Sequence, residues 1–208
     1  MSNPTDVLTL DEARGAIRTP ANVTAPNQDL QALYIPAVTT IVEDIIGPVV
    51  IRSFTDTFSP AVQQNWRDRY DSGPHSVLLE NRPIASVTSV TEWGTVLTAG
   101  TQYTADLSSG MVYAGTSLYP RLWLPGIDQV VVVYTAGRCA DTASVPANVK
   151  MAARLILAHN WQADQQGFRP DLGAGDGAMQ MTPSGYAIPR RAYAYLEPMA
   201  ITGIPSFA

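Results

Sequence analysis

The hydrophobic pattern of this chain changes its period twice, and these changes limit the folds that the chain can adopt. Apolar residues recur at three- and four-residue steps up to Gly47, at steps of two from Val49 to about Gly137, and at helical spacing after Val145. Helical segments on both sides of one β segment predict an α+β fold, in which a small α-helical bundle carries an inserted antiparallel β lobe. The expected parts are N-terminal helices (1–48), a β-rich insertion lobe (49–143), one long helix packing back on the N-terminal helices (144–166) and an extended C-terminal arm (167–208).

Two helices are expected before the β lobe. Thr9 and Glu12 have the spacing of a capping box, which predicts a first helix over 10–18. Asn27 is expected to cap a second helix that ends at Gly47. Pro36 lies inside this second helix and removes one of its hydrogen bonds, so we expect a kink or a restart there.

The β lobe is predicted from alternating β-branched residues separated by turn signals. The expected strands are 49–57, 76–80, 84–93, 102–106, 111–113 and 130–135, with turns at 81–83, 108–110 and 125–128. The apolar run 130–133 predicts a central strand that is covered on both faces. The segment 61–73 mixes charged and aromatic residues and is expected to be an exposed loop or hairpin tip.

The long helix is expected to reach about Gln165. Its apolar residues cover most of its circumference, and such a helix must be surrounded by protein. A neighbouring subunit is the simplest additional cover. The residues predicted for this subunit interface are Met151, Leu155, Leu157 and Trp161.

The C-terminal segment is rich in apolar residues, but prolines and glycines interrupt it throughout. It therefore predicts an extended arm that lies on another surface, either the body of the same chain or a partner. The alternative is a loosely ordered, solvated tail. Arginine and tyrosine are common at binding hot spots, so the predicted contact residues are Tyr186, Ile188, Pro189, Arg190, Arg191, Tyr193, Tyr195 and Leu196.

Composition excludes several classes of protein. The 208 residues carry a net charge of −5 with a pI near 4.9, which disfavours a dedicated nucleic-acid binder. The single Cys139 excludes an intramolecular disulfide framework and makes an intracellular folding compartment the default expectation. The N-terminus lacks the pattern of a secretory signal, and no apolar run approaches the roughly 18 residues of a membrane span.

The sequence offers no ordered set of catalytic or metal-binding residues. His75 and His159 lack metal-ligand spacing, and Cys139 has no histidine near it in sequence. The glycine cluster 173–177 fits no phosphate-binding motif, and 182–185 lacks the first glycine of a nucleophile elbow. The acids Asp68, Asp71 and Glu80 are interpreted as solvated loop residues. We therefore expect no catalytic residue, no metal and no cofactor.

The order of these elements resembles the head-to-tail connector (adaptor, or head-completion) proteins of long-tailed bacteriophages. The resemblance rests on the first-helix segment 8–13, the strand end Tyr134-Thr135-Ala136-Gly137 and the helix start Val145-Pro146-Ala147-Asn148-Val149-Lys150, and it covers nearly the whole chain. The longer β insertion and the extended tail depart from the compact helical members of that family.

The resemblance implies a non-enzymatic virion protein at the head-tail interface that assembles in the host cytoplasm. Such proteins form a homo-oligomeric ring, a dodecamer by this resemblance, beneath the portal protein; they extend the DNA channel and provide a docking surface for a stopper or tail-proximal neck protein. Double-stranded DNA would pass through without sequence-specific binding, and no membrane is involved. The alternatives are another virion structural protein, such as a tail-completion or head-decorating protein, and an uncharacterised enzyme that uses the β lobe as a pocket.

Overall fold

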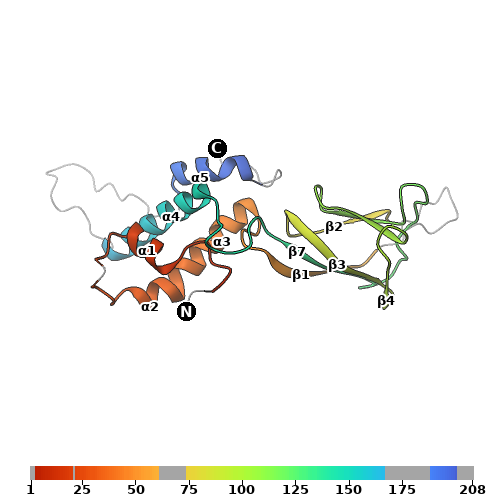
Figure 1. The fold of residues 1–208 in the computed structure, drawn as a ribbon, viewed down its shortest axis with the longest axis horizontal. Helices are drawn as coiled ribbons and strands as arrows, with labels where there is room; N and C mark the ends of the chain where they lie inside the picture. Colours follow the sequence, from red (N-terminus) through yellow and green to blue (C-terminus); the bar gives the residue numbers. More distant parts are fainter. Residues whose placement is uncertain (1–2, 21, 61–73, 167–187, 201–208) are drawn as a thin grey trace, which may run out of the picture. The chain divides into compact units, whose positions relative to one another are not determined.

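A computed structural model describes residues 3–20, 22–60, 74–166 and 188–200 (Figure 1). The chain divides into two compact units. The helical unit comprises Met1–Ile46 and Asp141–Ala208, and the β unit comprises Gly47–Ala140. Antiparallel sheets together with helices make this an α+β fold. No helix within the described ranges is long and apolar enough to cross a membrane.

The first predicted helix and its capping box are confirmed. Helix α1 (Leu10–Ala16) begins after Thr9, whose side chain accepts a hydrogen bond from the Glu12 backbone N–H. In return, a Glu12 carboxylate oxygen accepts from the Thr9 backbone N–H at 2.9 Å. Two backbone N–H groups that have no partner inside the helix are thereby satisfied, which fixes where this helix starts.

The second helix is continuous, but it changes geometry ahead of Pro36. It consists of α2 (Asn27–Asp29), a π-helical segment (Leu30–Tyr34) and α3 (Ile35–Ile46). Because Pro36 has no N–H to donate to the preceding turn, this widened turn is the physical form of the predicted irregularity. The prediction that Asn27 caps the helix is wrong: Pro26 holds the cap position, no side chain caps the helix, and Asn27 is its first residue. Gly47 ends the helix with a φ of 78°.

The long helix α4 (Ala147–Gln166) ends close to its predicted position and packs against α1, α3 and α5 of its own unit. Its buried residues follow helical spacing, so one stripe of the helix faces the core. This core is formed by residues of α1, the π-helical segment, α3, α4 and α5: Ala13, Leu30, Ile35, Val38, Val42, Ile46, Val149, Ala152, Ala153, Ile156, Leu157, Ala192 and Leu196.

The prediction of an extended arm over 167–208 is wrong for the part of it that the structure describes. Arg190–Leu196 forms helix α5, followed by a 3-10 turn over Glu197–Met199, and α5 lies along α4 (Figure 1). Ala192 and Leu196 are fully buried in this contact. The Asn148 amide donates to the Tyr195 carbonyl oxygen at 3.2 Å. The prolines in this segment do not keep the chain extended. Pro189 lies directly before the first residue of α5, and Pro198 lies two residues after its last.

The β unit contains two antiparallel sheets. The first sheet has the strand order β1-β7-β3-β4, with β1 (Arg52–Phe58), β7 (Val130–Ala136), β3 (Ile84–Glu92) and β4 (Thr95–Val96). The second has the order β2-β6-β5, with β2 (Ser76–Leu78), β6 (Met111–Ala114) and β5 (Tyr103–Asp106). Each predicted strand is present within a few residues of its expected limits, and β4 was not predicted. A two-residue strand is too short to show an alternating pattern.

Strand β7 is central, as its apolar run predicts, but only one of its faces is fully covered. Val130, Val132, Tyr134 and Ala136 are buried, whereas Val131, Val133 and Thr135 on the other face are half-buried. The buried face packs against the second sheet through Val77, Leu79, Tyr103, Val112, Ala114 and Trp123. The two sheets thus share one core, and each keeps an outer face.

A buried polar cluster joins the first sheet to the turn before β3. The Tyr134 hydroxyl donates to the Asp56 carboxylate at 2.8 Å and accepts from the Asn81 backbone N–H at 3.1 Å. Asp56 also accepts from the Glu80 backbone N–H at 2.9 Å. Buried polar groups must find partners, so this cluster fixes the 79–83 turn against β1 and β7.

Candidate functional site: exposed interaction surfaces

Helix α5 holds most of the residues predicted to contact a partner, but it divides them between core and surface. Arg190 and Arg191 are exposed, and Ile188, Pro189, Tyr193 and Tyr195 are half-buried. Leu196 is fully buried and therefore belongs to the core. Tyr186 lies outside the described residues. The surface that remains is a pair of guanidinium groups beside two partly exposed tyrosines.

The charges of α5 oppose its helix dipole. Arg190 and Arg191 occupy the first turn, no side chain caps this end, and Glu197 follows at the C-terminal end. Each such charge disfavours an isolated helix by about 0.3–1 kcal/mol. Neither guanidinium pairs with another described residue. Packing of Ala192 and Leu196 on α4 must therefore hold this helix, and its first turn is suited to an acidic partner.

The predicted subunit-interface residues of α4 differ in exposure. Met151 is 45% exposed, and Leu155 and Trp161 are half-buried. Leu157 is fully buried inside its own unit, so its side chain is not available to a neighbouring subunit. Sequence reasoning treated the whole apolar circumference as one surface, because it could not show that α1, α3 and α5 cover most of it.

Trp161 has an aromatic partner on the π-helical segment. Its ring meets the Tyr34 ring edge-on, with centroids 5.1 Å apart, and the Tyr34 hydroxyl donates to Asp164 at 2.6 Å. Burial, together with this carboxylate, raises the pKa of Tyr34 to about 12. The contact ties the C-terminal half of α4 to the second helix, so Trp161 has a structural partner within its own chain.

The candidate catalytic residues that the structure describes do not come together in one site. The Cys139 thiol is buried and donates to the Val49 carbonyl oxygen, and His75 lies 3.2 Å from the Arg121 carbonyl oxygen. His159 is exposed on α4 and Glu80 is exposed beside its turn. Asp68, Asp71, 173–177 and 182–185 lie outside the described residues. Within the described ranges, no group of three or more His, Cys, Asp or Glu side chains could hold a metal ion.

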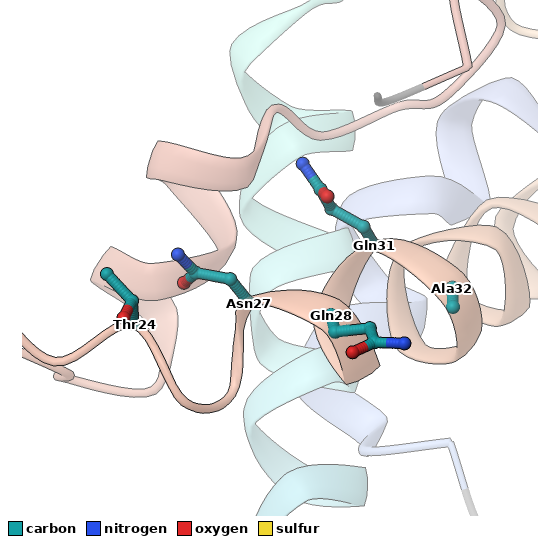
Figure 2. A pocket seen from close by; sticks show the side chains of 5 residues that line it. All are labelled: Thr24, Asn27, Gln28, Gln31 and Ala32. Carbon is teal, nitrogen blue, oxygen red and sulfur yellow. The ribbon is translucent and has the colours of Figure 1, made fainter.

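One shallow pocket lies at the start of the second helix. Figure 2 shows its lining side chains, which are Thr24, Asn27, Gln28, Gln31 and Ala32. The Asn27 side-chain oxygen is buried and has no hydrogen-bond partner among the described residues. The pocket is open and has neither a charged group nor a nucleophile with a neighbouring base. Its chemistry does not indicate a substrate site.

Two loops and the β3–β4 turn of the β unit display apolar side chains that sequence reasoning did not single out. Leu118 is 83% exposed, Tyr119 80% and Ile127 80%, and Trp93 lies exposed at the β3–β4 turn. The strand pattern gave no signal for these residues, because they lie between strands where periodicity is uninformative. Leu118 and Tyr119 are adjacent in the chain, so the first loop presents two large apolar side chains together.

Backbone and side-chain hydrogen bonds fix both loops in shape. In the first, the Tyr119 backbone N–H donates to the Thr116 hydroxyl at 3.1 Å, and the Thr116 N–H donates to the Tyr119 carbonyl at 3.1 Å. In the second, Ser59 and Asp128 exchange two hydrogen bonds of 3.0 and 2.9 Å. The Arg121–Glu92 ion pair, at 2.8 Å, holds the chain between the loops. These loops present their apolar tips without burying them, so little order has to be gained on binding.

Comparison with known proteins identifies the fold. No protein-family model and no curated protein matches the sequence. A solved structure described as the neck of an empty GTA particle computed with C6 symmetry contains a chain that is 19% identical, with a TM-score of 0.64 over 99% of this chain and 95% of that one. The virion of a native gene transfer agent (GTA) particle gives 19% identity and a TM-score of 0.61, covering 99% and 95% of the two chains. The neck of a native GTA particle computed with C12 symmetry contains a chain with 20% identity and a TM-score of 0.55, and the match covers 99% of this chain and 98% of that one. This chain therefore shares its whole fold with a component of phage-like neck and virion particles.

Proposed function

We propose that this protein is a structural, non-enzymatic component of the neck of a phage-like particle, where it forms the head-to-tail connector (adaptor) ring beneath the portal. The observation that carries the proposal is the fold match, which runs over 99% of this chain and 95% of a chain in a neck structure. Both units take part in a match of that extent. The resemblance noted in the sequence supports the same assignment.

The chemistry of the described surface agrees with an assembly role. It offers exposed apolar loops and an unpaired arginine pair, and none of its described His, Cys, Asp and Glu side chains gather as a group of three or more that could hold a metal ion. Assembly proteins need surfaces that neighbours cover, and enzymes need convergent reactive groups in a pocket. The ring would extend the DNA channel and offer a docking surface to the next neck or tail component.

For the portal contact, we propose the exposed face of α5 in place of a free arm. Arg190 and Arg191 would pair with carboxylates of the portal, and Tyr193 and Tyr195 would pack beside them. The charge pattern of α5 supports this role, because an acidic partner would neutralise two cations at the positive end of the helix dipole. On α4, Met151 and Leu155 are the proposed contacts with the neighbouring subunit.

An acidic channel wall would suit this role. With a net charge of −5, a ring of these subunits would repel phosphates, so DNA could move past without sticking. We propose that aspartate and glutamate side chains line the channel. An assembled ring whose channel wall is basic would remove this part of the proposal.

Charge reversal on α5 tests the assignment. Arg190→Glu and Arg191→Glu should each leave the fold intact, because both side chains are exposed, and should lower incorporation into portal-bearing particles severalfold. Arg18→Glu is the matched control, since it makes the same charge change at another exposed site. The readout is the amount of this protein retained on purified particles. Equal retention of all three variants would reject the portal contact, and absence of the wild-type protein from neck-bearing particles would reject the function.

Deleting the C-terminal segment is a weaker test. A truncation from Pro183 onward would remove Ala192 and Leu196 from the core and would uncover α4. Loss of incorporation would then follow from a disrupted core of the helical unit as readily as from a lost contact with the portal. Point substitutions on the exposed face of α5 avoid this ambiguity.

A further inference from the structure

The paired positions on the outer face of the first sheet are all serine, threonine or valine. Its members come from all four strands, and we call them the hydroxyl face: Ser53, Thr55, Thr57, Ser86, Ser89, Thr91, Val96, Val131, Val133 and Thr135. The strand register aligns them in three rows, which are Ser53–Thr135–Ser86, Thr55–Val133–Ser89 and Thr57–Val131–Thr91–Val96. The Ser86 and Thr135 hydroxyls lie 2.9 Å apart.

This composition is unusual for a sheet face that water covers. Protein surfaces normally intersperse charged residues of both signs, which keep the protein soluble and limit association. All members of the hydroxyl face are half-buried or exposed within their own chain, and none is charged. Its side chains are short and mostly β-branched, so no long side chain projects from the face. An uncharged surface of short, β-branched side chains is suited to packing against another protein surface.

The outer face of the second sheet differs in size but is also nearly free of charge. We call it the Tyr113 face; its rows are Ser76–Tyr113–Thr104 and Leu78–Met111–Asp106. Leu78 and Tyr113 are large and exposed, and the Tyr113 hydroxyl lies 3.2 Å from the Met111 sulfur. Asp106 is the one charged residue of this face. Hydrogen bonds from Ser108 and Ser109 lower the pKa of Asp106 to about 2, so the adjoining turn stabilises the negative charge of this carboxylate.

The two faces lie on opposite sides of the β unit, because the sheets that carry them pack together through one shared core. Two different surfaces are what a ring of more than two subunits needs, because each subunit contacts its two neighbours through different surfaces. We infer that the β units stack around the ring, with the hydroxyl face of one copy against the Tyr113 face of the next. This inference rests on the proposed function, since it specifies how the ring is built.

A second copy of this chain fits these faces better than other occupants. Nucleic acid and anionic lipid both require basic side chains, and neither face has one. Large side chains on one face can seat on short side chains of the other, with almost no charge to desolvate. The solved necks that share this fold were computed with C6 and C12 symmetry, which supports repeated copies around an axis.

The stacked faces are too small to hold two subunits together alone. From strand spacing and rise, the hydroxyl face covers roughly 200 Å², whereas a standard interface buries about 800 Å² on each partner. Contacts of the helical unit must supply the remainder. The pairwise contact will therefore be weak outside an assembled ring, and cross-linking within assemblies is a more direct test than affinity.

The test places one cysteine on each face. A Thr55→Cys/Tyr113→Cys double variant of the full chain is incorporated into particles or concentrated alone, treated with a short bis-maleimide, and separated under denaturing conditions. The expected result is a ladder of dimer, trimer and higher species, with neither single variant cross-linking. Cross-linking of the Thr55→Cys variant alone into dimers would show a face contacting its own copy and would overturn the inference. Wild-type protein controls for the native, buried Cys139.

Charge on the hydroxyl face provides a second readout. Val133→Asp and Thr55→Asp should reduce the ladder formed by the double cysteine pair Ser89→Cys/Tyr113→Cys at least fivefold, and Thr101→Asp, at an exposed position of the loop before β5 and outside both faces, should not. If the protein joins neck particles without any face-to-face ladder, the stacking is wrong and the proposed function stands. If a ladder forms from the protein alone but the protein never joins portal-bearing particles, the proposed function is wrong and the stacking stands.

Discussion

Lys150 donates a hydrogen bond to Glu12 at 2.7 Å and so joins α4 to the capping box of α1. Glu12 therefore has two roles, because its other carboxylate oxygen accepts from the Thr9 backbone N–H at 2.9 Å. Lys150 is the only lysine in the sequence. Nothing in its position suggested a role, since its partner lies 138 residues away along the chain.

Removing this pair should destabilise the helical unit. Glu12→Ala loses both the cap and the ion pair and should lower the free energy of unfolding by about 1–2 kcal/mol, and Lys150→Met should lower it by up to about 1 kcal/mol. Urea unfolding of both single variants and the double variant measures the coupling, with the exposed Asp44→Asn as control. Strictly additive effects would contradict the proposed link.

The same carboxyl should make stability depend on acid pH. Burial acts to raise the pKa of Glu12, but hydrogen bonds from Lys150 and Thr9 outweigh it and hold the pKa below its ordinary value of 4.5. The unfolded chain then binds this proton more readily than the folded chain, so stability is lost as pH falls through and below 4.5. The difference in unfolding free energy between wild type and Glu12→Gln should shrink over that range. A constant difference from pH 7 to pH 3 would disprove the assignment.

Tyr134→Phe should destabilise the β unit by about 1–3 kcal/mol, because Asp56 and the Asn81 N–H each lose a buried partner. Tyr113→Phe is the matched control, since that hydroxyl is exposed and contacts a sulfur atom. Its effect should stay within about 0.5 kcal/mol. Urea unfolding followed by tryptophan fluorescence compares them, and equal effects would show that the polar cluster is not stabilising.

Leu196→Ala should release α5 before the rest of the helical unit unfolds. The side chain is fully buried against a short helix with unfavourable end charges, and such truncations cost about 2–5 kcal/mol. Amide hydrogen exchange over residues 190–199 should accelerate at least tenfold, with little change in α1. Arg191→Ala, at an exposed position of the same helix, is the control. Unchanged protection of α5 would mean that packing on α4 does not hold it.

The apolar loop tips should matter for assembly and not for stability. Leu118→Ser/Tyr119→Ser and Ile127→Ser should each change the free energy of unfolding by less than about 0.5 kcal/mol, because these side chains are already exposed. The same variants should lower retention of the protein on neck particles. Full retention would exclude these loops from the interface, and a large loss of stability would mean that they belong to the core.

The sequence alone predicted most elements of the fold, because local chemistry determines them. The capping box defines the start of α1, the missing N–H of Pro36 predicts the irregularity in the second helix, and alternating β-branched residues define β1, β3 and β7. These signals act over a few residues, so a single sequence contains them in full.

Only the tertiary structure decided which apolar and charged groups face one another. It buries Leu157 and Leu196, which the sequence assigned to interfaces, because α1, α3 and α5 close around α4. It pairs Lys150 with Glu12, and it aligns serine, threonine and valine from four strands on one face through their register. Burial and pairing depend on contacts between residues far apart in the chain, and periodicity along the chain contains no information about such contacts.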